Sequence, residues 1–123
     1  MIAVFYLSPN SYLSMGAFMT HTVLATFRVR AGQQAKLSGL LDHHWQIISL
    51  RGFGEGPQPV RLIRHDSDGD VMLELFDWRD GGLNDALQDE AVRQVWLAID
   101  HCCEPRGGAP QSEFPAIERV RRG

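Results

Sequence analysis

The residue best suited to chemistry in this chain is His44. It lies in the stretch QQAKLSGLLDHHWQIISL, where leucine and isoleucine recur at the 3.6-residue period of a helix. At about 100° per residue, the apolar stripe centres on His44, so its imidazole is predicted to point at the sheet. A buried imidazole without an acidic partner stays neutral at pH 7 and can take a proton from a phenol or an activated carbon acid. His44 is therefore either a catalytic base or ligand contact in a pocket, or a core histidine held by hydrogen bonds.

Four aromatic side chains are candidate walls for a pocket around His44. Phe76 and Trp78 alternate on one face of a predicted strand, and Trp96 falls on the apolar stripe of a later predicted helix. Trp45 borders the stripe of His44, where it either roofs a pocket or covers the edge of the domain. Apolar walls with few polar groups are the usual form of a site for a small hydrophobic or aromatic ligand. Trp96 also has a simpler interpretation, as a core residue.

One carboxylate, Glu74, lies among apolar residues on that same strand face. If this face lines a cavity, Glu74 is placed to orient His44 or a substrate. If it faces a partner subunit, Glu74 is expected to form an ion pair with Arg28 or Arg61, because a buried carboxylate needs a partner. The sequence leaves both alternatives open and favours the ion pair.

The remaining reactive residues predict no metal site and no cofactor. Cys102 and Cys103 are adjacent, so a disulfide between them is strained, and their flanking His101 and Glu104 do not converge with them on a helix. The acidic turn at 66–70 lacks the glycine and the closing glutamate of a calcium loop. Two unpaired cysteines fit a reducing compartment, and we expect a cytoplasmic protein.

The net charge of −3 and the absence of a basic stripe argue against nucleic-acid binding. The apolar N-terminal stretch is too short and too interrupted to span a membrane. It carries no charge over residues 1–18 and precedes a clear strand, so we interpret 1–18 as an extension or an over-long start, and 19–123 as a single domain.

The elements that must position these residues follow from periodicity and turn chemistry. Asp89 is a predicted N-cap inside the second helical region, and Gly52 a predicted C-terminal cap of the first. The predicted order is a strand at 21–30, a helix at 33–50, a loop at 52–59, strands at 60–65 and 71–78, a helical region at 80–104 and a strand near 113–120.

This order predicts an α+β domain with a four-stranded antiparallel sheet and two helices on one face. The second face then has no cover, although Leu24 lies on it between Thr22 and Thr26. A bare, half-apolar sheet face usually finds a partner, so we expect a homodimer through the sheet face.

The stretch MLELFDWRDGGLNDALQDEAVRQVW, residues 72–96, resembles the antibiotic-biosynthesis-monooxygenase-like proteins, and the resemblance extends over about residues 20–120. It implies a ferredoxin-like βαββαβ fold, assembly as a dimeric α/β barrel, and a pocket between sheet and helices in each subunit. Members of that family include cofactor-independent oxygenases of polycyclic aromatic substrates.

Three hypotheses for function result. The first is a cofactor-independent monooxygenase acting on a small aromatic or hydrophobic compound, with His44 as base and Trp45, Glu74, Phe76, Trp78 and Trp96 around the ligand. The second is a small-molecule-binding module without chemistry. The third is a structural dimer whose core is filled.

Overall fold

The computed structural model describes residues 21–120. The predicted extension at 1–18 lies outside the described residues. None of the helices within 21–120 has both the length and the apolar character needed to cross a membrane. The elements follow in the order β1 (His21–Arg28), α2 (Gln34–Leu50), β2 (Gly54–Asp66), β3 (Gly69–Trp78), α3 (Gly82–Leu87), α4 (Glu90–His101), β4 (Ser112–Glu113) and β5 (Ala116–Ile117).

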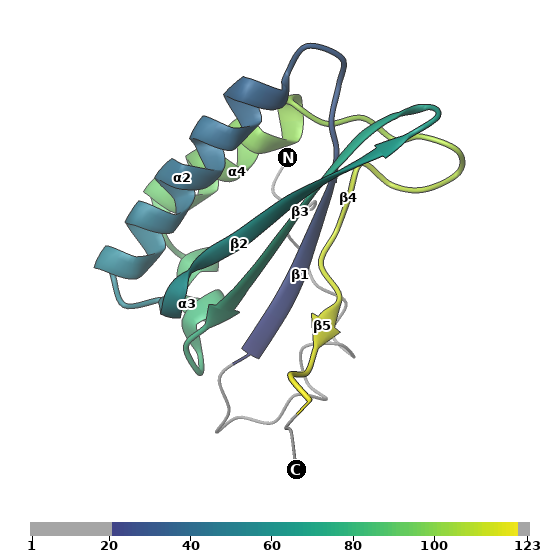
Figure 1. The fold of residues 1–123 in the computed structure, drawn as a ribbon. Coiled ribbons are helices and arrows are strands. Elements are labelled where there is room, and N and C mark those ends of the chain that lie inside the picture. Colours follow the sequence, from purple (N-terminus) through teal and green to yellow (C-terminus); the bar gives the residue numbers. More distant parts are fainter. Residues whose placement is uncertain (1–20, 121–123) are drawn as a thin grey trace.

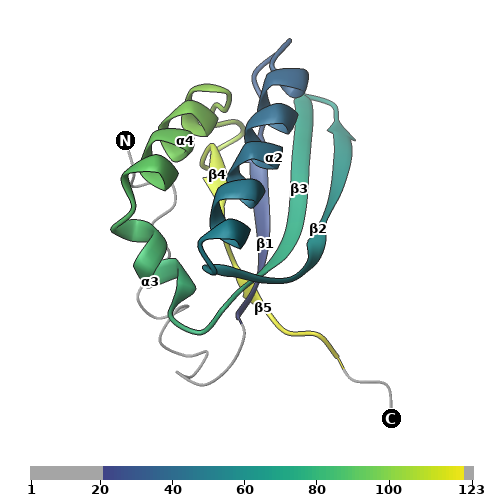
Figure 2. The ribbon, with the colours of Figure 1, turned by 90° about the vertical axis from the view of Figure 1, so that its left-hand side faces the viewer.

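The strands form one open antiparallel sheet in the order β2-β3-β1-β4, and β5 also pairs with β1. Figures 1 and 2 show α2 and α4 side by side over one face of this sheet. The predicted α+β class with an antiparallel sheet is thus confirmed.

The two central strands alternate as the sequence predicted. On β1, the residues Val23, Ala25, Phe27 and the following Val29 are each at most 2% exposed. Glu74 pairs in register with Ala25, and so the buried residues of β3 share the helix-facing side with those of β1. Period-two alternation therefore selects the helix-facing residues, while Thr22, Thr26 and Val71 on the opposite face are also buried, at 7%, 8% and 2% exposure.

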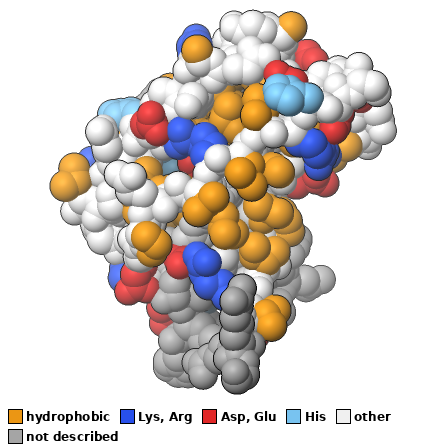
Figure 3. All heavy atoms as spheres, in the orientation of Figure 1, with side chains coloured by type: hydrophobic (Ala, Val, Ile, Leu, Met, Phe, Trp, Pro, Cys, Tyr) orange, Lys and Arg blue, Asp and Glu red, His pale blue; other side chains and the backbone are white. Residues whose placement is uncertain are grey.

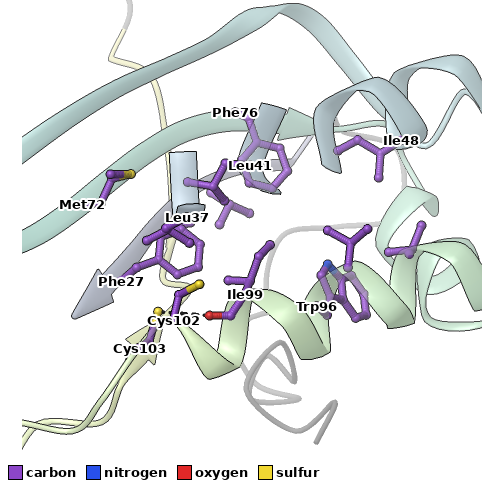
Figure 4. Close-up of a cluster of buried hydrophobic side chains, with 14 of the residues drawn as sticks. Phe27, Leu37, Leu41, Ile48, Met72, Phe76, Trp96, Ile99, Cys102 and Cys103 are labelled. Atoms are coloured by element: carbon purple, nitrogen blue, oxygen red, sulfur yellow. Dashed lines mark hydrogen bonds between the residues drawn. The ribbon is translucent and has the colours of Figure 1, made fainter. Parts of the chain in front are cut away.

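The helices contribute the other half of the core. Leu37, Leu41, His44 and Ile48 are the buried residues of α2, and Val92, Val95, Trp96 and Ile99 are those of α4. Figure 4 shows that side chains from both helices and the sheet converge in one cluster, including Leu37, Leu41, Ile99, Phe27, Met72 and Phe76. Each helix buries one stripe, as expected for helices that pack on a sheet.

The helix ends follow local chemistry. The Asp89 carboxylate accepts a hydrogen bond from the backbone N–H of Val92 at 3.1 Å, which caps α4. Gly52 adopts a φ of 74°, a conformation that suits glycine just beyond the end of α2. Both predicted caps are confirmed.

Two predicted boundaries are wrong. The strand predicted at 60–65 begins earlier, at Gly54, because Gly54 and Glu55 pair with β3 before a bulge interrupts the ladder up to Val60. The prolines of this segment, at 57 and 59, lack a backbone N–H and are tolerated because β2 is an edge strand.

The strand predicted near 113–120 is broken into β4 and β5. Phe114 and Pro115 separate the two short pairings, and the Phe114 ring packs edge-on against Phe27 with 5.8 Å between centroids. The last strand is thus interrupted where Phe114 packs on the core and where Pro115 lacks a backbone N–H.

Candidate functional site

The candidate site is centred on a hydrogen bond between α2 and α4. His44 is 2% exposed and Trp96 is fully buried. The indole Nε1–H of Trp96 donates to Nε2 of His44 at 2.9 Å. Because an indole nitrogen donates and does not accept, Nε2 must be the acceptor, and the proton of the neutral ring then lies on Nδ1.

The His44 ring lies among three aromatic rings. Its centroid is 6.1 Å from those of Phe76 and Trp78 and 6.2 Å from that of Trp96. Burial among these rings lowers the pKa of His44 to about 4, and the neighbouring His43 adds to the shift. His44 is therefore neutral at pH 7, as predicted, and its Nε2 lone pair is engaged by Trp96.

Trp45 lies at the border of this cluster. Its ring centroid is 6.5 Å from that of Phe76, and the side chain is partly buried. A Cβ added at Gly54 would come within 2.7 Å of the Trp45 ring. Trp45 therefore covers the junction between α2 and the start of β2, where only a glycine leaves enough room.

Glu74 is engaged in a buried ion pair with Arg61. The carboxylate is 1% exposed and accepts hydrogen bonds from Arg61, at 2.9 Å from Nη2 and 3.3 Å from Nε. Arg61 Nη1 also donates to Asp42 at 2.9 Å and to the Ser38 hydroxyl at 3.1 Å. Burial raises the pKa of Glu74, and the Arg61 guanidinium opposes that shift. The network fixes α2 to the edge strand β2.

For Glu74, the predicted partner is present, but the predicted face of the sheet is not the one observed. Its partner is Arg61, one of the two predicted, but the pair lies on the helix-facing side and not on the face predicted to meet a partner subunit. Within residues 21–120 its hydrogen bonds go to Arg61 and none reaches His44. Of the two alternatives, the ion pair that the sequence favours is the one formed, with Arg61 on the adjacent strand.

The other reactive residues lie away from this cluster. Cys102 and Cys103 are buried free thiols, and burial raises the pKa of Cys103 to about 12. His101 is exposed, as is His65, which pairs with Asp70 at 2.7 Å. Across the described part of the chain, no three histidine, cysteine or acidic side chains converge in a way that could hold a metal ion.

A second candidate surface is the open face of the sheet. Val60, Leu75 and Leu24 are aligned across β2, β3 and β1, and Leu62 and Leu73 form the next row. Val60 is 55% exposed and Leu62 is 61% exposed. We call these five residues the open-face patch, and Figure 3 shows hydrophobic side chains gathered over the strands.

Two features of the site were not predicted from the sequence. No local pattern links Trp96 to His44, because the two residues are 52 positions apart. The Ser38 and Asp42 contacts of Arg61 were also missed, although their spacing of four residues places them on one side of a helix.

The comparisons with known proteins place the fold and nothing finer. No family model and no curated protein matches this chain. A crystal structure of a conserved protein from Methanosarcina mazei Go1 is similar, with a TM-score of 0.59 over 85% of this chain and 96% of that one. The two sequences are 10% identical, so the likeness extends to the arrangement of sheet and helices alone.

Proposed function

We propose that this chain is a non-catalytic, ferredoxin-like homodimer of the antibiotic-biosynthesis-monooxygenase-like type, in which the residues around His44 form a filled core. The single observation that carries the proposal is the hydrogen bond from Trp96 to Nε2 of His44. A general base needs a free lone pair within reach of the proton it removes. The lone pair of His44 is already engaged by a buried indole.

The surroundings of the imidazole agree with a structural role. Phe76, Trp78 and Trp96 pack around it, and the buried carboxylate of Glu74 on the same sheet face is paired with Arg61. Polar groups that are buried and satisfied in this way specify the packing of a core. The interior thus supports an assembly module more directly than a reaction centre.

Native mass spectrometry of protein purified directly from its host tests the filled core. We expect a dimer whose mass equals two chains at both gentle and harsh settings. A dimer that carries a small aromatic mass at gentle settings would instead identify a binding module, and would name the class of its ligand.

The homodimer is proposed to form through the open-face patch. Leu62 and Val60 expose most of their apolar surface to solvent in the single chain. Face-to-face pairing of two such sheets about a two-fold axis buries both copies of the patch and gives a dimeric α/β barrel. Sedimentation velocity at micromolar concentration is expected to give the mass of two chains, and a monomer at all concentrations would contradict this assembly.

A second candidate function is a cofactor-independent monooxygenase acting on a small aromatic compound. One observation favours it, because burial keeps His44 neutral among aromatic rings that a flat substrate could stack against. Catalysis would require the Trp96 indole to leave Nε2 when substrate enters. Oxygen consumption with a panel of dihydroxy-aromatic compounds, lost in His44→Gln while the dimer persists, would establish this candidate.

We further propose a reducing, cytoplasmic location. Cys102 and Cys103 are both buried and unpaired with each other, and their raised thiol pKa values make them unreactive. Thiol counting under native and denaturing conditions should find both cysteines reduced.

A further inference from the structure

The bond between His44 and Trp96 joins the two helices that cover the sheet. Both side chains are buried, and the bond connects α2 directly to α4. The bond depends on the Nε2 lone pair of His44, because the indole N–H of Trp96 can only donate. Loss of that lone pair breaks this hydrogen bond, which is the polar contact set among the apolar side chains that the two helices share in the core.

Protonation of His44 does this. An imidazolium carries an N–H at both ring nitrogens, so Nε2–H and the indole N–H would become two donors that face each other in the interior. We propose that the His44–Trp96 bond is an acid-sensitive latch: when His44 gains a proton, the Trp96 indole is released and α2 and α4 part at this level. The inference is independent of the proposed function.

Within residues 21–120, the groups that pack against His44 favour its neutral form. Phe76 and Trp78 on β3 and Trp96 on α4 carry no charge. On α2 the titratable neighbour is His43, which opposes a second positive charge nearby. The cluster therefore resists protonation until the solution is acidic.

Other titratable groups lie on the same side of the sheet. Glu74 on β3 is committed to Arg61 on β2. His21 on β1 pairs in register with Trp78, and Asp100 lies one turn beyond Trp96 on α4. Titration of these groups can also change the signals with pH, so the experiment has to separate their effects from that of His44.

The sign of the pH dependence follows from the depressed pKa. Burial lowers the pKa of His44 from 6.5 to about 4 when the latch is closed. An open, hydrated His44 titrates near its ordinary value and binds a proton more readily than the closed one. The latch is therefore complete above pH 6.5 and is lost as the pH falls toward 4.

Nuclear magnetic resonance of the full chain tests the latch without any variant. At pH 7 the His44 ring should show the Nδ1–H tautomer, and the Trp96 indole N–H should be protected from solvent exchange. Between pH 6.5 and 4, we expect the His44 ring and the Trp96 indole to change with one midpoint, while far-ultraviolet circular dichroism keeps its helical signal.

Two variants separate the latch from general acid unfolding. Glutamine at position 44 can accept the indole N–H and does not titrate, so His44→Gln should remove the indole transition. His43→Gln is the matched control at the exposed neighbour and should keep it. An unchanged transition in His44→Gln overturns the proposal, as does a His44 ring that titrates while the Trp96 indole signal stays constant.

Discussion

The two faces of the sheet differ in how far their side chains are buried and paired within the single chain. On the helix-facing side even the polar groups are buried and satisfied, with Nε2 of His44 bonded to Trp96 and Glu74 to Arg61. On the open side, Thr22 donates a hydrogen bond to Asp77 at 2.6 Å, and beside this pair the open-face patch leaves Leu62 61% exposed. The single chain fills its interior, whereas the open-face patch leaves apolar surface in contact with solvent, and the proposed dimer would bury it. Changes on the first side should act on folding, and changes on the second on association.

Removing the largest buried side chain should have the greatest effect. Trp96→Ala deletes a fully buried indole together with the hydrogen bond to His44. We expect the free energy of unfolding to fall by about 3–5 kcal/mol, as measured by urea denaturation. Trp45→Ala, at the half-buried border, should cost clearly less. Equal losses in the two variants would mean that the interior is not organised around Trp96.

Breaking the buried ion pair should have an intermediate effect. Glu74→Ala leaves the Arg61 guanidinium with Asp42 and Ser38 but without its buried partner. We expect a loss of about 1–3 kcal/mol of unfolding free energy, because Arg61 keeps some access to solvent. Urea denaturation near pH 7 measures it.

The Glu74→Gln variant sharpens this test through pH. Burial raises the folded pKa of Glu74 above its ordinary value of 4.5. The folded state then binds the proton more readily than the unfolded state, so the contribution of Glu74 to stability is present below pH 4.5 and is lost as the pH rises through the folded pKa. Glutamine does not titrate, so the Glu74 contribution, seen as the difference between the pH profiles of the two proteins, should be greatest below pH 4.5 and should shrink as the pH rises above it. An identical pH profile would show that Glu74 is not the group responsible.

A change at the helix cap should have a smaller effect. Asp89→Ala removes the acceptor for the Val92 N–H and an ion pair with Arg51 at 3.2 Å. The expected cost is about 1 kcal/mol, measured by thermal and urea unfolding. Asp85→Ala, which removes only an exposed ion pair with Arg79 at 2.7 Å, serves as the control and should change stability by less than about 0.5 kcal/mol.

The smallest effect on folding is expected on the open face. Leu62→Asp should change the unfolding free energy of the monomer by less than about 0.5 kcal/mol, because the side chain is already largely in water. In the proposed dimer two copies of the charge are buried, so the dissociation constant should rise about a hundredfold or more. Urea denaturation measures the unfolding free energy, and sedimentation equilibrium measures the dissociation constant.

The control for that variant is Leu50→Asp. Leu50 is 88% exposed at the end of α2, away from the open-face patch. It should leave the dimer intact. If both aspartates weaken the dimer equally, or neither does, the open-face patch is not the interface.

Much of the fold was predictable because its signals are local. The alternation from Val23 to Val29 and the stripe through His44 each require only neighbours within a few positions. The Asp89 cap is likewise a contact over three residues. The start of β2 was missed because Gly54 becomes a strand residue only by pairing with Trp78. No property of the GFGEGPQP segment predicts that pairing.

In the candidate site, too, the features that depend on local sequence were predictable and those that depend on distant contacts were not. Composition and periodicity established that a histidine and several aromatic residues would be interior, since burial follows from the period of each element. The partner of each polar group was settled by the packing of distant elements. Trp96 reaches His44 because α4 packs beside α2, and Arg61 reaches Glu74 because β2 pairs with β3 in one register. The sequence presents His44 as a possible base, but in the folded chain its Nε2 lone pair accepts a hydrogen bond from Trp96, a residue that only tertiary packing brings near.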